Sequence, residues 1–230
     1  MSPEICLFSA EGSLDKVIEL LDQDQALINT VDEDGRAANQ PQVVEFLIKR
    51  KADINCKDEF NMTPLLICAA SGYTDLVKIL LASGADPNSQ NSSGQTALHY
   101  SASKNLPELS QLLLAHKADP FLINSISQTA LHRAAARGSI GVISLLLEHP
   151  SSSKLINLKD TEGNTPLHLA CEENNADAAI ALIKCCSELS KASKNCSNLY
   201  LDGTNSAGLT AIGLCSDPKV KQYIISNTSF

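Results

Sequence analysis

Apolar and polar positions recur along this chain in blocks of nearly constant length. Each block begins with Thr, a small residue or Pro, an apolar residue and, in most cases, His. These tetrapeptides are Thr63-Pro64-Leu65-Leu66, Thr96-Ala97-Leu98-His99, Thr129-Ala130-Leu131-His132, Thr165-Pro166-Leu167-His168 and a degraded Thr210-Ala211-Ile212-Gly213. They start 33, 33, 36 and 45 residues apart. Self-similarity at such a spacing indicates an array of structural repeats.

Within each block, the pattern predicts two helices. A run of small residues such as Ala134-Ala135-Ala136 predicts a thin first helix, whose first turn suits Pro64 and Pro166. Nine residues after the Thr comes a Gly or Asn, which accepts the positive φ that ends a helix. A Leu-rich stretch such as 75–81 then predicts a second helix, whose apolar stripe fills the space between layers.

The period, the tetrapeptide and the closing segment Gly84-Ala85-Asp86-Pro87-Asn88 together resemble the ankyrin repeat. The resemblance implies an all-α ankyrin-repeat solenoid of about seven units including caps, in one domain. No unit buries its apolar face alone, so the array is the folding unit. The expected units are an amino-terminal cap over 1–31, a truncated repeat over 32–57, repeats over 58–90, 91–123, 124–159 and 160–204, and a carboxy-terminal cap over 205–230.

Two units depart from the regular length. The second unit runs only from Asp32 to the start of the third at Asp58, and second-helix sequence begins already at Pro41. This unit therefore lacks its tetrapeptide and most of its first helix. The sixth unit has extra residues around Ser187–Tyr200 that are rich in Ser, Lys and Asn, which predicts an exposed loop.

The charge of the chain is −8, and it is unevenly spread. Residues 1–123 carry 9 Lys/Arg and 17 Asp/Glu, whereas residues 124–230 carry 9 of each. A basic partner would be drawn to the acidic half, although solubility alone also accounts for the excess. Binding to nucleic acid is not expected, because phosphate contacts need clustered Lys and Arg. With no long apolar run and no basic amino-terminal segment, we expect a soluble intracellular protein with reduced thiols.

Candidate catalytic side chains are present, but their spacing favours structure. His99, His132 and His168 each end a tetrapeptide, where the imidazole can bond the preceding Thr and a carbonyl of the next repeat. No Walker loop, H-E-x-x-H or EF-hand pattern occurs. We therefore expect no enzymatic activity, no metal and no cofactor. Leu169-Ala170-Cys171-Glu172-Glu173 matches L-x-C-x-E, a pattern associated with binding to retinoblastoma-type pocket proteins, but its place in a first helix favours coincidence.

Three segments, 160–171, 96–105 and 130–136, closely resemble the gankyrin family. That resemblance implies a monomeric chaperone of the cytoplasm and nucleus that helps to assemble the proteasome regulatory particle. Such proteins hold the C-terminal domain of one base ATPase subunit on their concave face and release it as the particle matures. By family position, the partner contacts are Asp34, Arg36, Glu59 and Lys104.

Further candidate contacts follow from the repeat geometry, because residues at equal offsets in successive repeats share one face. At the concave offsets of the later repeats lie Tyr100, Arg133, Arg137 and Glu173. Acidic turns near the amino terminus and bases farther along suggest a partner with the opposite order of charges. The alternative is an ankyrin-type inhibitor that binds and blocks a kinase or a transcription factor.

Overall fold

The fold is helical throughout the part of the chain that the computed structural model describes, residues 41–192 and 203–228. Within these ranges there is no strand, only an isolated bridge between Thr204 and Thr210. The predicted all-α class is therefore confirmed. The backbone divides into two compact units.

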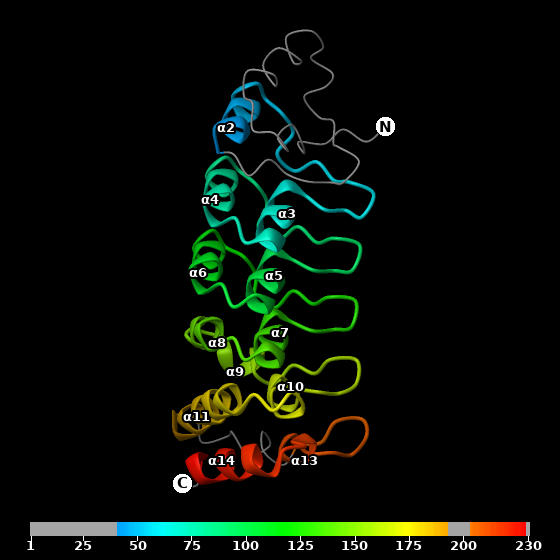
Figure 1. Ribbon diagram of the computed structural model, residues 1–230, viewed down its shortest axis with the longest axis vertical. Helices are drawn as coiled ribbons and strands as arrows, with labels where there is room; N and C mark the ends of the chain where they lie inside the picture. Colours follow the sequence, from blue (N-terminus) through cyan, green and yellow to red (C-terminus); the bar gives the residue numbers. More distant parts are fainter. Residues whose placement is uncertain (1–40, 193–202, 229–230) are drawn as a thin grey trace. The chain divides into compact units, whose positions relative to one another are not determined.

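The first unit comprises residues 1–97 and 112–118. Its described helices are α2 (Pro41–Lys49), α3 (Pro64–Ser71) and α4 (Thr74–Ala82). Helix α4 packs against both α2 and α3 (Figure 1). The side chains at the centre of this packing are fully or almost fully buried: Leu65, Leu66, Leu76, Val77 and Leu80.

The second unit comprises residues 98–111 and 119–230. Its helices are α5 (Ala97–Ser103) and α6 (Pro107–Ala115), which both cross the boundary, α7 (Ala130–Arg137), α8 (Ile140–Leu147), α9 (Ser152–Leu155), α10 (Pro166–Glu172), α11 (Ala176–Ala192), α13 (Ala211–Leu214) and α14 (Pro218–Thr228). The first helices form one row, in which α10 packs against α7 and α13, and the second helices form another, in which α11 packs against α8 and α14 (Figure 1).

The first helices end as the sequence predicts. Gly72, Asn105, Gly138 and Asn174 have φ values of 84°, 54°, 65° and 56°. In this left-handed conformation, the Gly138 N–H reaches back to the carbonyls of the last turn of α7. Pro64 and Pro166 occupy the first helical turns of α3 and α10, where the missing N–H leaves no bond unmade.

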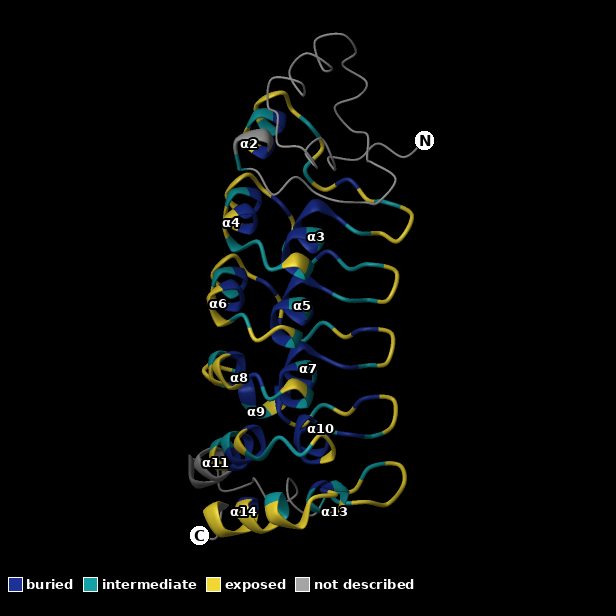
Figure 2. Cartoon of the chain, in the orientation of Figure 1, coloured by how far each residue is buried: buried dark blue, intermediate teal, exposed yellow. Residues whose placement is uncertain are grey.

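Small side chains allow close packing of the first helices. In α7, Leu131, Ala134 and Ala135 have no exposed surface, and Figure 2 shows the same burial along α10. Helix α14 is different, because Ile224 is the one buried side chain among those described in it. The last helix of the second unit is thus attached along a single narrow stripe.

The two irregular units can be followed only in part. Helix α2 begins at Pro41, as expected for a second helix, while residues 32–40 and the cap over 1–31 lie outside the described residues. The loop predicted around 187–200 needs correction, because α11 continues to Ala192. The segment 187–192 contains neither Gly nor Pro, so nothing in it stops the helix; residues 193–200 are not among those described.

Candidate protein-binding face

Each loop before a first helix is held by the same polar turn. In the first of them, the Asp58 carboxylate accepts the N–H groups of Phe60 and Met62 at 2.8 and 2.7 Å. The corresponding side chains in the later turns are Asn91, Asn124, Asp160 and Asn205, each bonded to the second and fourth N–H that follow. The residue three positions on has positive φ in every case, namely Asn61, Gly94, Ser127, Gly163 and Gly208.

The sequence predicts a turn at the start of each unit, including Asn205–Gly208 in the carboxy-terminal cap, but the side-chain bonds that hold these turns were not predicted, although their signal was present. An Asp or Asn three residues before a Gly, Asn or Ser recurs at the period of the tetrapeptides. The short Asp or Asn side chain competes well for local N–H groups, which is why it nucleates turns. The five turns therefore have one conformation and present their tips in register within each unit.

Successive turns are also bonded to each other. The Ser92 N–H donates to the Phe60 carbonyl at 2.8 Å in the first unit. In the second unit the Thr161 N–H donates to the backbone carbonyl of Ile126 at 3.1 Å. The Ser206 N–H donates to the backbone carbonyl of Glu162 at 2.9 Å. Because the tips are tied in this way, side chains on them are held at fixed spacings, which lowers the entropy cost of binding a partner.

Two buried histidines make the bonds that the tetrapeptide predicts. The Thr129 N–H donates to His132 Nδ1 at 3.2 Å, so the proton lies on Nε2, which donates to the Asn164 carbonyl at 3.2 Å. His99 Nε2 bonds the Gln128 carbonyl at 2.9 Å. Burial lowers the pKa of His132, and it lowers that of His99 to about 4. These imidazoles are neutral structural groups.

The comparisons with known proteins agree with this geometry. The family model for ankyrin repeats (three copies) matches residues 35–124 and 106–198. The chain belongs to the ankyrin-repeat family. No curated protein matches the chain. Ankyrin-repeat proteins are binding scaffolds for other proteins, so this chain has a protein-binding surface.

No helix within residues 41–192 and 203–228 combines the length and the apolar character needed to cross a bilayer. Over the same described ranges, no group of three or more His, Cys, Asp and Glu side chains is arranged to hold a metal ion.

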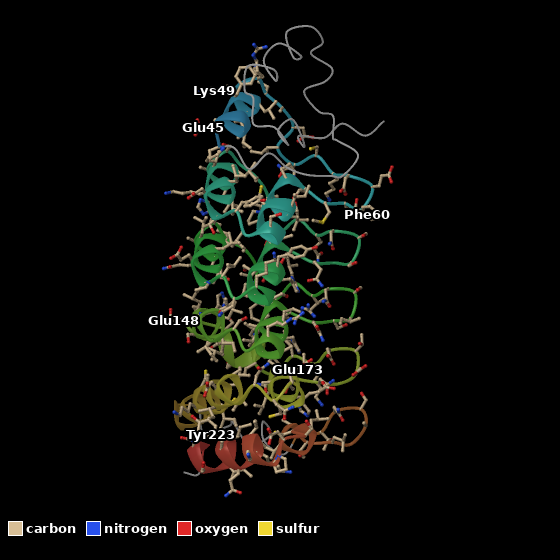
Figure 3. The ribbon with its side chains drawn as sticks, in the orientation of Figure 1. Glu45, Lys49, Phe60, Glu148, Glu173 and Tyr223 are labelled. Carbon is tan, nitrogen blue, oxygen red and sulfur yellow. The ribbon has the colours of Figure 1, made fainter. Side chains whose placement is uncertain are left out.

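The sequence-predicted contacts in the first unit are only partly described. Asp34 and Arg36 lie outside the described residues. Glu59 is exposed on the first polar turn, beside Phe60, whose side chain is 66% exposed and is labelled in Figure 3. The exposed aromatic tip was not among the predicted contacts, although its place two residues after Asp58 marks it as a turn tip.

The predicted contacts in the second unit occupy equivalent places on the first helices or directly after them. Lys104, Arg137 and Glu173 each lie eight residues after the Thr of their ankyrin tetrapeptide, and all three are exposed. Glu173 follows the last residue of α10 (Figure 3). Tyr100 and Arg133 lie four residues after their Thr and are half-buried. The second unit thus presents a basic face over α5 and α7, defined by Lys104, Arg133 and Arg137, and its sign reverses at Glu173.

Within the basic face, the structure joins Arg133 to a residue that the sequence analysis did not single out. Arg133 Nε donates to Ser103 Oγ at 3.1 Å, across from α7 to the end of α5. Ser103 is the last residue of α5 and belongs to its run of small residues. Burial, and then the charge of Arg137, lower the pKa of Arg133.

The L-x-C-x-E segment is packed into the ankyrin array. Leu169 and Cys171 are 7% and 0% exposed on α10. Burial, and then the neighbouring Cys215, raise the pKa of Cys171 to about 12, and burial raises that of Cys68 to about 12. In the folded chain, neither the Leu nor the Cys of this motif is accessible to a pocket protein, and both thiols are unreactive.

Proposed function

We propose that this ankyrin-repeat chain assists assembly of the proteasome regulatory particle by holding the C-terminal domain of one base ATPase subunit. The support comes from the gankyrin-like segments 160–171, 96–105 and 130–136, which supply much of α5, α7 and α10. As in that family, the role is that of a non-catalytic monomer in cytoplasm and nucleus. The observation that carries the proposal is the row of exposed charges at one recurring offset, Lys104, Arg137 and Glu173.

The order of acidic and basic residues along this chain is the feature that such a partner would recognise. Acidic residues dominate residues 1–123, and the basic face lies on α5 and α7. A partner domain with a basic patch followed by an acidic one would match both. Complementary charges of this kind raise association rates and select the register of binding.

The direct test is binding of purified base ATPase C-terminal domains, each expressed singly, to the full chain. Asp34→Lys combined with Glu59→Lys should weaken capture about tenfold or more, about 1.4 kcal/mol. The loss should shrink at high salt, which screens exposed charges. Lys104→Glu should weaken capture through the other end of the partner. His168→Ala is the control, because it should lower stability and leave the affinity of the folded fraction nearly unchanged.

The outcome also separates the alternative role. If no ATPase domain binds, and quantitative affinity purification instead returns a kinase or a transcription factor whose activity the chain suppresses, the chain is a blocking inhibitor. If acidic reversals bind as wild type does at low salt while Tyr100→Ala abolishes capture, the interface is apolar and the charge order has no role.

A further inference from the structure

Arg133 differs from the other charged residues of the candidate face in being half-buried and held in place. Its Nε donates to Ser103 Oγ at 3.1 Å, so the flat guanidinium is fixed against the end of α5. Ser103 and Arg133 both belong to the second unit and lie 30 residues apart in sequence. The planar guanidinium of Arg133 is therefore oriented before a partner binds.

The bond to Ser103 engages only the Nε edge of the guanidinium, and the Nη1 and Nη2 edge makes no bond to Ser103. With Nε engaged, the Nη1 and Nη2 groups at the far end still carry four N–H donors in a plane. Over the part of the chain that the structure describes, Ser103 is the hydrogen-bond partner of this side chain and no carboxylate pairs with it. A half-buried cation without a counter-ion is costly to maintain, because burial removes water that would otherwise solvate it.

A second cation makes the arrangement more unfavourable in the isolated chain. Arg137 follows one helical turn later on α7, and its charge adds to burial in lowering the pKa of Arg133. Like charges at this spacing destabilise a helix slightly. Lys104, next in sequence to Ser103, adds a third positive charge to the same face. The local excess of positive charge suits an anionic partner group.

We infer that Arg133, oriented by Ser103, is the specificity-determining anchor of the basic face. Its Nη1 and Nη2 groups bind a side-chain carboxylate of the partner protein through two parallel hydrogen bonds. This inference rests on the proposed function for the identity of the partner. Lys104 and Arg137 then act as exposed rim charges. Two parallel N–H···O bonds need a planar fork, which Arg has and Lys lacks.

The test compares equal charges with different shapes. Arg133→Lys keeps the charge and loses the fork, and Arg137→Lys is the matched control one turn away. With a bound ATPase C-terminal domain, we expect Arg133→Lys to raise Kd about tenfold or more and Arg137→Lys to raise it less than about threefold. Ser103→Ala should weaken binding in the wild-type background and have no effect on top of Arg133→Ala. Melting curves of each variant confirm that the folded state is being compared.

Where a complex forms, its dependence on Arg133 decides the inference. If Arg133→Lys binds as tightly as wild type, or if both Lys variants lose affinity equally, the anchor is wrong while the chaperone role stands. Where no ATPase domain binds, the proposed function fails, and a glutamate-rich helical peptide becomes the probe. If this peptide shifts the NMR resonance of the Arg133 Nε–H saturably, and a matched peptide with glutamine in place of glutamate does not, the role of Arg133 as the anchor is supported. Absence of that shift, or a shift given only by a phosphoserine version, overturns it.

Discussion

Two successive junctions of the second unit are built from the same sequence signals and differ in how they are closed. The inner junction joins the repeat of α7 and α8 to that of α10 and α11. The terminal junction joins the latter to α13 and α14. Both begin with a Thr-x-Leu-His tetrapeptide, and both contain a polar turn and a left-handed residue after the first helix. The two junctions differ in the hydrogen bonds between repeats, whereas the bonds within each repeat are alike.

The inner junction is closed by buried and partly buried bonds, although the buried Gln128 Oε1 makes no hydrogen bond among the described residues. His132 Nε2 donates to the Asn164 carbonyl, and Gln128 Nε2 donates to Asp160 at 3.1 Å. Asn175 Nδ2 donates to the carbonyls of Ala135 and Ala136 at 3.3 and 2.9 Å, and so caps the carboxyl end of α7. These bonds satisfy groups that a lone helix leaves unpaired.

The terminal junction keeps the local bonds and loses the buried one. The Thr165 N–H donates to His168 Nδ1 at 3.4 Å, which leaves the proton on Nε2. That buried Nε2 makes no well-formed hydrogen bond among the described residues. Burial lowers the pKa of His168, and the carbonyls of Leu209 and Gly203 oppose this effect. An unpaired buried donor costs about 1–3 kcal/mol, so the cap is attached less firmly than its sequence suggests.

The largest effect that sharpens this comparison is expected at the polar turns. A Cβ on Gly163 would lie 2.9 Å from the backbone nitrogen of Ser206, and Gly163 has φ +76°. Gly163→Ala should therefore cost about 3–4 kcal/mol through combined clash and left-handed strain. Gly208→Ala, in the last turn, has the same strain at φ +75° and meets nothing within 4 Å, so about 1 kcal/mol is expected. Urea denaturation measures both, and equal losses would show that the turns do not touch.

The next largest effect on stability is expected from removing the imidazoles of His132 and His168. His132→Ala should cost about 2–3 kcal/mol, because it leaves the buried Thr129 N–H without a partner and removes one of the two hydrogen bonds to the Asn164 carbonyl, whose other donor is the Asp160 N–H. His168→Ala should cost about half as much, since its Nε2 makes no bond to lose. Differential scanning calorimetry of the two variants gives the comparison. A larger loss at His168 would mean that the terminal bond forms in solution.

Acid should weaken the array through its buried neutral histidines. The pKa of His99 is lowered from its ordinary 6.5 to about 4, so the folded state resists protonation that the unfolded chain accepts. The stability contribution is complete above pH 6.5 and is lost as pH falls from there toward 4, about 2 kcal/mol at pH 5 for this group. Melting as a function of pH should show a flatter slope for His99→Gln.

Sequence reasoning captured the elements that depend on near neighbours in the chain. The left-handed residues Gly72, Asn105, Gly138 and Asn174, the Pro first turns and the Thr–His caps are all set within one block, and all are confirmed. The extension of α11 to Ala192 was missed, because a Ser- and Lys-rich segment was read from its polarity rather than from its lack of helix breakers.

The exposure of the candidate contacts was predictable from the sequence, and their hydrogen bonds were not. Equal offsets in a repeat place Lys104, Arg137 and Glu173 correctly on the surface. The bond between Arg133 and Ser103 joins residues of different repeats, so it depends on the distance between α5 and α7, which no single block encodes. Likewise, whether His168 finds a carbonyl depends on where the following cap sits.

The smallest expected effect concerns Asn174, which ends α10 with φ 56° where Gly138 ends α7. Its side chain accepts the Asp217 N–H at 3.0 Å and donates to Ser216 Oγ at 2.9 Å, both exposed bonds. Exposed bonds contribute little, and Gly is easier to place at positive φ, so Asn174→Gly should change stability by less than about 0.5 kcal/mol. The converse change, Gly138→Asn, puts a Cβ 2.9 Å from Asn175 Oδ1 and should cost about 1–3 kcal/mol. Chemical denaturation of both variants decides the matter: a loss above about 1 kcal/mol for Asn174→Gly would mean that these exposed bonds hold the terminal cap in place of the missing imidazole bond.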